Sequence, residues 1–158
     1  MNKNSLKNIS ILVLIGSLIG LSACRKDDIC TEPATPKLGV GFYDESQPDE
    51  KKAVAHLTLV ALPVLDTLIT DKTIDSIAIP LNVNADNCRF ILQQDTNKDT
   101  LVFQYQIERV FVSKACGYKA IFHQLQVALV PDNNNWIKQI ELLKNEILED
   151  TIHLKILH

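Results

Sequence analysis

Hydrophobic and polar residues alternate along most of the chain, which is the pattern expected of β-strands that bury one face. Between residues 37 and 43, Leu38, Val40 and Phe42 fall on one face, and two glycines and a tyrosine fall on the other. Prolines and clusters of Asp and Asn separate such segments, as is usual for turns. The segments predicted to be strands are 37–43, 53–62, 76–83, 88–94, 100–113, 119–130 and 151–157, with a weaker strand and turn over 64–73.

The longest of these segments, 100–113, has one apolar face that Arg109 interrupts. The apolar residues of that face are Leu101, Phe103, Tyr105, Ile107 and Phe111. By the same alternation, His153 lies on the polar face of 151–157 and is expected to be solvated.

Residues 136–148 carry two conflicting patterns. Trp136, Ile140, Leu143 and Ile147 recur at helical spacing, so periodicity alone predicts a helix. However, the segment lies between a turn and the alternating segment 151–157. A hairpin of 136–143 with 151–157 would complete an antiparallel sheet, and we favour it over the helix.

Seven or eight short strands at regular spacing predict an all-β fold, an antiparallel β-sandwich of immunoglobulin-like type, over residues 37–158. The fold by itself carries no function. Residues 24–36 are charged and contain prolines, which is typical of a tether.

The first 23 residues have the organisation of an export signal. Two lysines precede an apolar stretch of about a dozen residues, which is too short to span a bilayer. The stretch ends in Leu21-Ser-Ala-Cys24, which resembles the bacterial lipobox, whereas an uncleaved anchor would be longer. We therefore predict a signal peptide over 1–23, a lipid on Cys24, and stable attachment to the outer membrane by more than one acyl chain.

The charge of the chain argues against nucleic acid as a partner. The full sequence has 16 basic and 19 acidic side chains and a formal charge of −3. Loss of the signal removes Lys3 and Lys7 and no acid, so the mature chain is more negative still. Nucleic-acid-binding surfaces carry basic stripes, and none is present.

Outside the cytoplasm, cysteines are candidates for disulfides. With Cys24 lipidated, Cys30, Cys88 and Cys116 allow one bridge in three pairings. Cys88 shares a strand face with Phe90, which suggests a buried thiol. Cys30 and Cys116 have polar, loop-like surroundings, so we favour a Cys30–Cys116 bridge.

Asp95, Asn97 and Asp99 have the spacing that opens a calcium loop. The rest of the segment does not match that loop. Thr100 occupies the position of the sharp-turn glycine, and Gln106 occupies the position of the bidentate glutamate. We therefore favour a polar hairpin turn.

No set of residues predicts catalysis or a metal cofactor. Strand pairing could bring His56 and His123 together, but a zinc site needs a third ligand that the sequence does not identify. Ser113 with His123 lacks a nucleophile-turn signature. Cys116 as a nucleophile is less favoured than Cys116 in a disulfide. We predict a protein that is not an enzyme and has no cofactor.

Four aromatic residues are candidates for a sugar-binding face, namely Tyr43, Tyr105, Tyr118 and Trp136. Three of them lie in or beside predicted strands, where aromatic side chains usually pack into the core. A glycan- or small-ligand-binding protein is thus the alternative to a non-enzymatic interaction module.

Several motifs resemble an uncharacterised lipoprotein family of Bacteroidota. They are Cys24-Arg-Lys-Asp-Asp-Ile-Cys-Thr-Glu32, Thr35-Pro-Lys-Leu38, Phe42-Tyr-Asp44, Ile79-Pro-Leu81, Val112-Ser-Lys-Ala-Cys-Gly-Tyr-Lys119, Trp136-Ile137 and His153-Leu-Lys-Ile156. The two cysteine motifs agree with the Cys30–Cys116 pairing, and Cys88 lies outside the pattern. The resemblance implies membrane anchoring and an outer-membrane barrel protein as a candidate partner, but no activity.

That origin gives Lys26, Asp27 and Asp28 a second interpretation. Directly after the lipidated cysteine, they resemble the acidic signal that sends Bacteroidota lipoproteins to the cell surface. The alternative is a solvated linker on a protein that faces the periplasm.

Four Asp-Ser/Thr-aliphatic tripeptides match the O-glycosylation pattern of the same phylum. The acceptor residues are Thr67, Ser76, Thr100 and Thr151. The alternative is ordinary turn chemistry, in which Asp caps a turn and Thr or Ser opens a strand.

Overall fold

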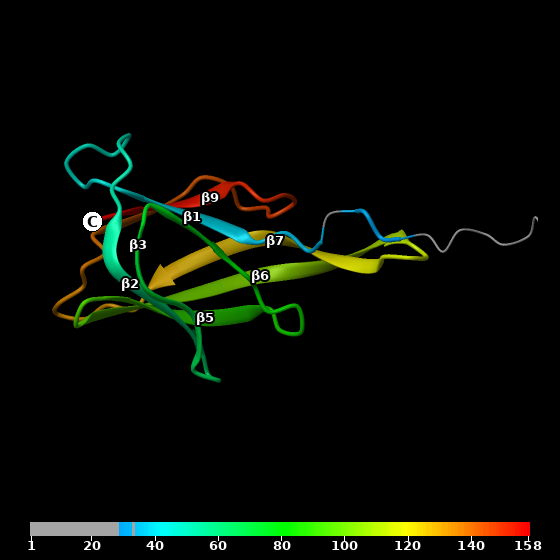
Figure 1. The fold of residues 1–158 in the computed structure, drawn as a ribbon, viewed down its shortest axis with the longest axis horizontal. Helices are drawn as coiled ribbons and strands as arrows, with labels where there is room; N and C mark the ends of the chain where they lie inside the picture. The colour runs from blue at the N-terminus through cyan, green and yellow to red at the C-terminus, as the bar shows by residue number, and fades with distance from the viewer. Residues whose placement is uncertain (1–28, 33) are drawn as a thin grey trace, which may run out of the picture. The chain divides into compact units, whose positions relative to one another are not determined.

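The alternating segments form β-strands that are arranged in two sheets (Figure 1). The computed structural model describes residues 29–32 and 34–158, so the signal peptide, Cys24 and the 26–28 motif lie outside the described residues. The nine strands are β1 Leu38–Tyr43, β2 Val54–Leu62, β3 Asp66–Ile74, β4 Ser76–Ile79, β5 Asn87–Gln94, β6 Asn97–Ser113, β7 Gly117–Leu129, β8 Gln139–Leu142 and β9 Ile152–Leu157. The predicted all-β sandwich is confirmed, with nine strands rather than seven or eight.

The chain divides into two compact units. Among the described residues, one unit contains residues 29–32 and 112–117. The other contains the rest of the described chain and holds the core of both sheets.

The four-stranded sheet has the order β4-β1-β9-β8. β1 runs antiparallel to β4 but parallel to β9, and β8 is antiparallel to β9. The hairpin of β8 and β9 confirms the preferred prediction for the last third of the chain. The helix suggested by the spacing of Trp136 and Ile140 is wrong, since residues 29–32 and 34–158 contain no helix.

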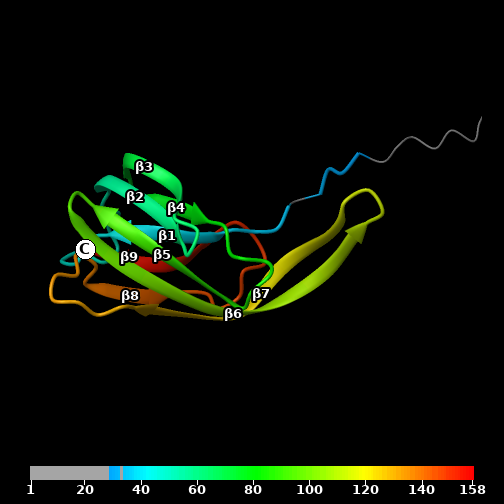
Figure 2. The same cartoon turned by 90° about the horizontal axis from the view of Figure 1, so that it is seen from below.

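The five-stranded sheet has the order β3-β2-β5-β6-β7. The pairs β2 with β3, β2 with β5 and β5 with β6 are antiparallel. Figure 2 shows β2 beside β3 in a second view. In this sheet β2 joins β3 through residues 63–65 and β5 joins β6 through residues 95–96, and both turns are exposed.

The core consists of the alternating apolar faces of both sheets. Leu38, Val40 and Phe42 of β1 are fully buried, as their spacing predicts. In β6, Leu101 and Phe103 are buried as well. Phe111, the last predicted member of that face, is not in the core. Its side chain is 55% exposed, so the apolar face of β6 continues beyond the part of the sheet that has a partner layer.

His153 is buried, and the prediction that it is solvated is wrong. Its side chain is 1% exposed, and its Nδ1 accepts a hydrogen bond from the Gly39 N–H at 3.2 Å. The reason is a register shift between β1 and β9. Gly39 pairs with Ile152 and Val40 pairs with Leu154, which leaves His153 as an extra residue in β9 and breaks the alternation there.

We expect acid to weaken the fold through His153. Burial lowers the pKa of this side chain below its usual value of 6.5, and the positive charge of Lys144 adds to the effect. The unfolded chain therefore takes up the proton at a higher pH than the folded chain. As a result, His153 makes the free energy of unfolding decrease as the pH falls below about 6.5.

Two histidines at the surface, His56 and His123, have the opposite effect on how the free energy of unfolding depends on pH. Hydrogen bonds to Asp71 and Glu146 raise the pKa of His56 and His123, so their ion pairs contribute stability at low pH that is lost as the pH rises. Denaturant unfolding of wild type and His153→Gln between about pH 7.5 and 5 separates the two effects. The wild type should lose more stability on acidification than the variant, and parallel pH profiles would contradict the assignment.

Candidate functional site

The four aromatic residues considered for a sugar-binding face do not share one surface. Trp136 and Tyr105 are buried in the core. The Trp136 Nε1–H donates to the Leu92 carbonyl at 3.1 Å, and the Tyr105 hydroxyl donates to the Asn82 carbonyl at 2.9 Å. Core packing, the favoured interpretation, is thus confirmed for both residues.

His56 and His123 have separate partners. The His56 Nδ1 lies 2.6 Å from Asp71 Oδ1, and the hydrogen bond to this carboxylate raises the pKa of His56. His123 lies between Glu146, at 3.3 Å, and Glu108, at 3.0 Å. Both histidines therefore form surface ion pairs. Within the described part of the chain, no three ligand-type side chains converge on one metal position.

Ser113 has a role in the turn between β6 and β7. Its Oγ accepts the N–H of Cys116 at 3.0 Å, as a turn-forming serine commonly does. Cys116 is bonded to Cys30, which confirms the favoured disulfide, and Cys88 is the free thiol among the described cysteines. Neither Ser113 nor Cys116 is arranged as a nucleophile.

Asp99 is a structural residue. It is fully buried, its Oδ1 accepts from Asn135 Nδ2 at 3.0 Å, and its Oδ2 accepts from the Ile137 N–H at 2.7 Å. The carboxylate thus holds the connection between β7 and β8. Asp95 lies in the exposed turn between β5 and β6, so the calcium-like spacing does not assemble a cation site and the hairpin turn is confirmed.

The four candidate glycosylation acceptors differ in accessibility. Thr67 is exposed near the start of β3, whereas Ser76, Thr100 and Thr151 are half-buried. The Ser76 hydroxyl also donates to Asp75 at 2.8 Å. Modification of any of the four stays a prediction, and Thr67 is the acceptor best placed for an enzyme to reach.

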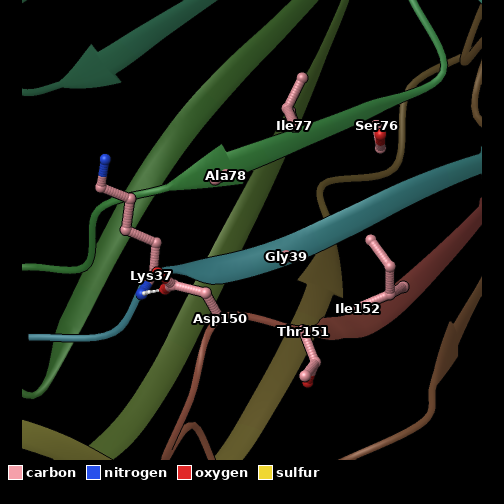
Figure 3. Close-up of a pocket in the computed structure, with 8 residues that line it drawn as sticks. All are labelled: Lys37, Gly39, Ser76, Ile77, Ala78, Asp150, Thr151 and Ile152. Atoms are coloured by element: carbon pink, nitrogen blue, oxygen red, sulfur yellow. Dashed lines mark hydrogen bonds between the residues drawn. The ribbon is translucent and has the colours of Figure 1, made fainter. Parts of the chain in front are cut away.

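A small cleft lies on the four-stranded sheet beside Gly39 (Figure 3). It has a volume of about 350 Å³, and its floor is the backbone of β1, β4 and the start of β9. The Lys37 N–H donates to Asp150 Oδ1 at 2.8 Å, while the Lys37 ammonium points away from that carboxylate. The Asp150 carboxylate is therefore engaged by the backbone at the start of β1.

A larger groove of about 790 Å³ lies between the β2–β3 hairpin and the β4–β5 connection. The residues that line it run from Ala61 to Asp66 with Leu68, from Pro80 to Asn82, and from Asn87 to Phe90 with Ala85. Most of these side chains are apolar. Val64 and Leu65 are 81% and 67% exposed, so the groove opens onto an apolar rim. Such a site suits an apolar group.

The polar groups of the groove favour binding over catalysis. Burial raises the pKa of the Cys88 thiol, so the thiol stays protonated and is a poor nucleophile. Burial also raises the pKa of the neighbouring Tyr105 phenol. Arg89 and Asp66 are exposed at the rim, where they can orient a bound molecule.

Leu65 has an unusual backbone conformation. It is the last residue of the three-residue turn Pro63-Val64-Leu65, and its φ is +59°. The last position of such a turn normally holds glycine or asparagine, because other side chains are strained at positive φ. The pattern of hydrophobic and polar residues does not predict this groove. The available signal was a short turn with two apolar residues and no glycine or asparagine.

The comparisons with known proteins identify a family but no activity. A model described as a family of unknown function (DUF6452) matches residues 56–158, which include all residues that line the groove. No curated protein and no solved structure shows significant similarity to the chain. Within the residues that the structure describes, no helix has the length and hydropathy to cross a membrane.

Proposed function

The chain belongs to DUF6452, a family of unknown function, and we propose that it is a non-enzymatic binding module of an envelope assembly. In this proposal, lipid on Cys24 anchors the module to the outer membrane. The groove binds an apolar segment of a protein partner, for which an outer-membrane barrel protein is the leading candidate. Lys26, Asp27 and Asp28 direct the module to the cell surface, which protease treatment of intact cells would test.

The observation that carries this proposal is that Leu65 is both exposed and held at a positive φ. A leucine at positive φ costs the folded protein free energy, and its exposed side chain recovers little by burial. Residues that are both strained and exposed are typical of binding sites, where a contact with another molecule offsets the cost. Val64 beside it is more exposed still and does not have a positive φ, so the two residues form one apolar rim.

The volume of the groove supports a second candidate function, the binding of a small apolar ligand. Ligand pockets commonly measure about 300–1,000 Å³, and this groove falls within that range. A free sugar fits less well, because the lining has few polar side chains and neither Trp136 nor Tyr105 faces solvent.

We expect Leu65→Asn to stabilise the protein and to weaken binding. Asparagine adopts positive φ at lower cost than leucine, so the free energy of unfolding should rise by about 0.5–1 kcal/mol. The variant also removes the apolar rim contact. Denaturant unfolding measures the first effect, and photo-crosslinking in native membranes, from a benzophenone amino acid at position 64, measures the second.

The crosslinking also separates the two candidate functions. A protein adduct that forms from position 64, and not from the exposed control position Leu148, supports the interaction module. An adduct with a small mass increase supports the ligand-binding alternative. Equal crosslinking from both positions, or no loss of adduct in the Leu65→Asn background, would contradict a specific role for the groove.

A further inference from the structure

Two aromatic side chains are exposed side by side where β6 ends and β7 begins. Phe111 is 55% exposed and Tyr118 is 69% exposed. Their ring centroids are 5.3 Å apart and the rings meet edge to face. Exposing two aromatic rings to water is unfavourable. Such a pair therefore indicates that a second surface covers it.

The sequence around this pair is basic, although the chain as a whole is acidic. Residues 109–119 contain Arg109, Lys114 and Lys119 and no Asp or Glu, against a formal charge of −3 for the full chain. Arg109 and Lys114 are exposed, whereas Lys119 is half-buried and, as the residue after Tyr118 in β7, points to the other face of the sheet. Aromatic rings next to basic side chains are typical of segments at the interface of an anionic membrane.

The disulfide limits how far this segment lies from the lipid. Cys116, two residues before Tyr118, is bonded to Cys30. Cys30 follows Cys24 by six residues, and a fully extended chain spans at most about 3.6 Å per residue, or roughly 22 Å. The bridge therefore keeps the aromatic pair near whatever surface holds the lipid of Cys24.

We propose that the aromatic pair, Phe111 and Tyr118, rests on the lipid bilayer to which Cys24 is anchored. The two rings lie at headgroup level, and Arg109 and Lys114 face anionic lipid phosphates. Each basic side chain near an anionic surface strengthens attachment, and aromatic rings are favoured at the boundary between water and hydrocarbon. This inference rests on the proposed lipid anchor, and it assigns a membrane-facing segment to a protein whose groove contacts a different partner.

The test uses the lipidated protein in vesicles of phosphatidylethanolamine and phosphatidylglycerol that contain brominated lipids. Tyr118→Trp places a fluorophore at the proposed contact, and Leu148→Trp places one at an exposed control position. The native Trp136 is buried and supplies the background in both variants. We expect the added fluorescence of Tyr118→Trp to be quenched at least about twofold more than that of Leu148→Trp.

Failure of this inference can be distinguished from failure of the anchor. Intact mass and flotation with vesicles test the lipid on Cys24 independently of the tryptophans. Protein that floats but shows equal quenching in both variants overturns the bilayer contact and leaves the anchor in place. Equal quenching, together with protection of residues 111–118 from hydrogen exchange in native membranes alone, would assign the surface to a protein partner and also overturn the proposal.

Discussion

Replacing Gly39 with alanine is expected to lower the free energy of unfolding by about 4 kcal/mol or more. This is the largest effect that we expect from adding one methyl group anywhere in the chain. A Cβ at this position would overlap the Thr151 carbonyl oxygen and lie 2.7 Å from the Thr151 carbonyl carbon. Both atoms belong to the backbone of the residue that directly precedes β9, the strand parallel to β1. Because backbone atoms cannot rotate away, the two strands would have to separate.

Separation of these strands would also remove the Gly39 hydrogen bond to His153, which would leave a buried imidazole without its partner. Chemical denaturation followed by circular dichroism measures the loss. Gly41→Ala is the matched control in the same strand. Its Cβ would meet the Tyr43 ring at 2.7 Å, and that half-buried side chain can move. A cost for Gly41→Ala as large as that for Gly39→Ala would contradict the role assigned to the β1–β9 junction.

Replacing Asp99 with asparagine is expected to lower the free energy of unfolding by about 3 kcal/mol. The carboxylate accepts hydrogen bonds from Asn135 and from the backbone of Ile137. An asparagine can accept one of them, but its amide N–H would face the other donor. The connection from β7 to β8 also carries Trp136, so loss of this anchor loosens a core side chain.

Asp95→Asn provides the control for Asp99→Asn, since it makes the same chemical change at the other end of the 95–99 spacing. Asp95 is exposed in a turn with a φ of +51°, a conformation that asparagine tolerates well. We expect a change within about 0.5 kcal/mol. Added calcium should leave the unfolding of wild type unchanged, and a calcium-dependent gain in stability that Asp99→Asn abolishes would contradict the structural role of Asp99.

The Asp99 contacts show how much of a site the sequence could have predicted. Asp99 lies two residues before Leu101 and four before Phe103, so the alternation of β6 already places it on the same face as these core residues. The residue type, which is common in turns, outweighed that signal. Its partners could not be predicted, because Asn135 and Ile137 lie more than thirty residues away and reach it only through the path of the β7–β8 connection.

His153 and Phe111 mark the limits of the alternation itself. Strand periodicity assigns a face only while the ladder is regular, and the extra residue in β9 reverses the face at His153. Phe111 follows the alternation and lies on the same face as Phe103, yet no partner layer covers it. For Leu65 the composition of the turn was visible in the sequence, but the positive φ and the groove beside it were not.

The sequence alone therefore determined the strands and most of their buried faces, and it favoured the β8–β9 hairpin and the Cys30–Cys116 pairing over their alternatives. These features depend on local geometry, since side chains alternate with a period of two, and on the chemistry of a few residues. Only the tertiary structure decided the parallel pairing of β1 with β9, the burial of His153, the anchor at Asp99 and the groove beside Leu65. Each of these depends on contacts between residues far apart in the chain, which alternation along one strand does not encode.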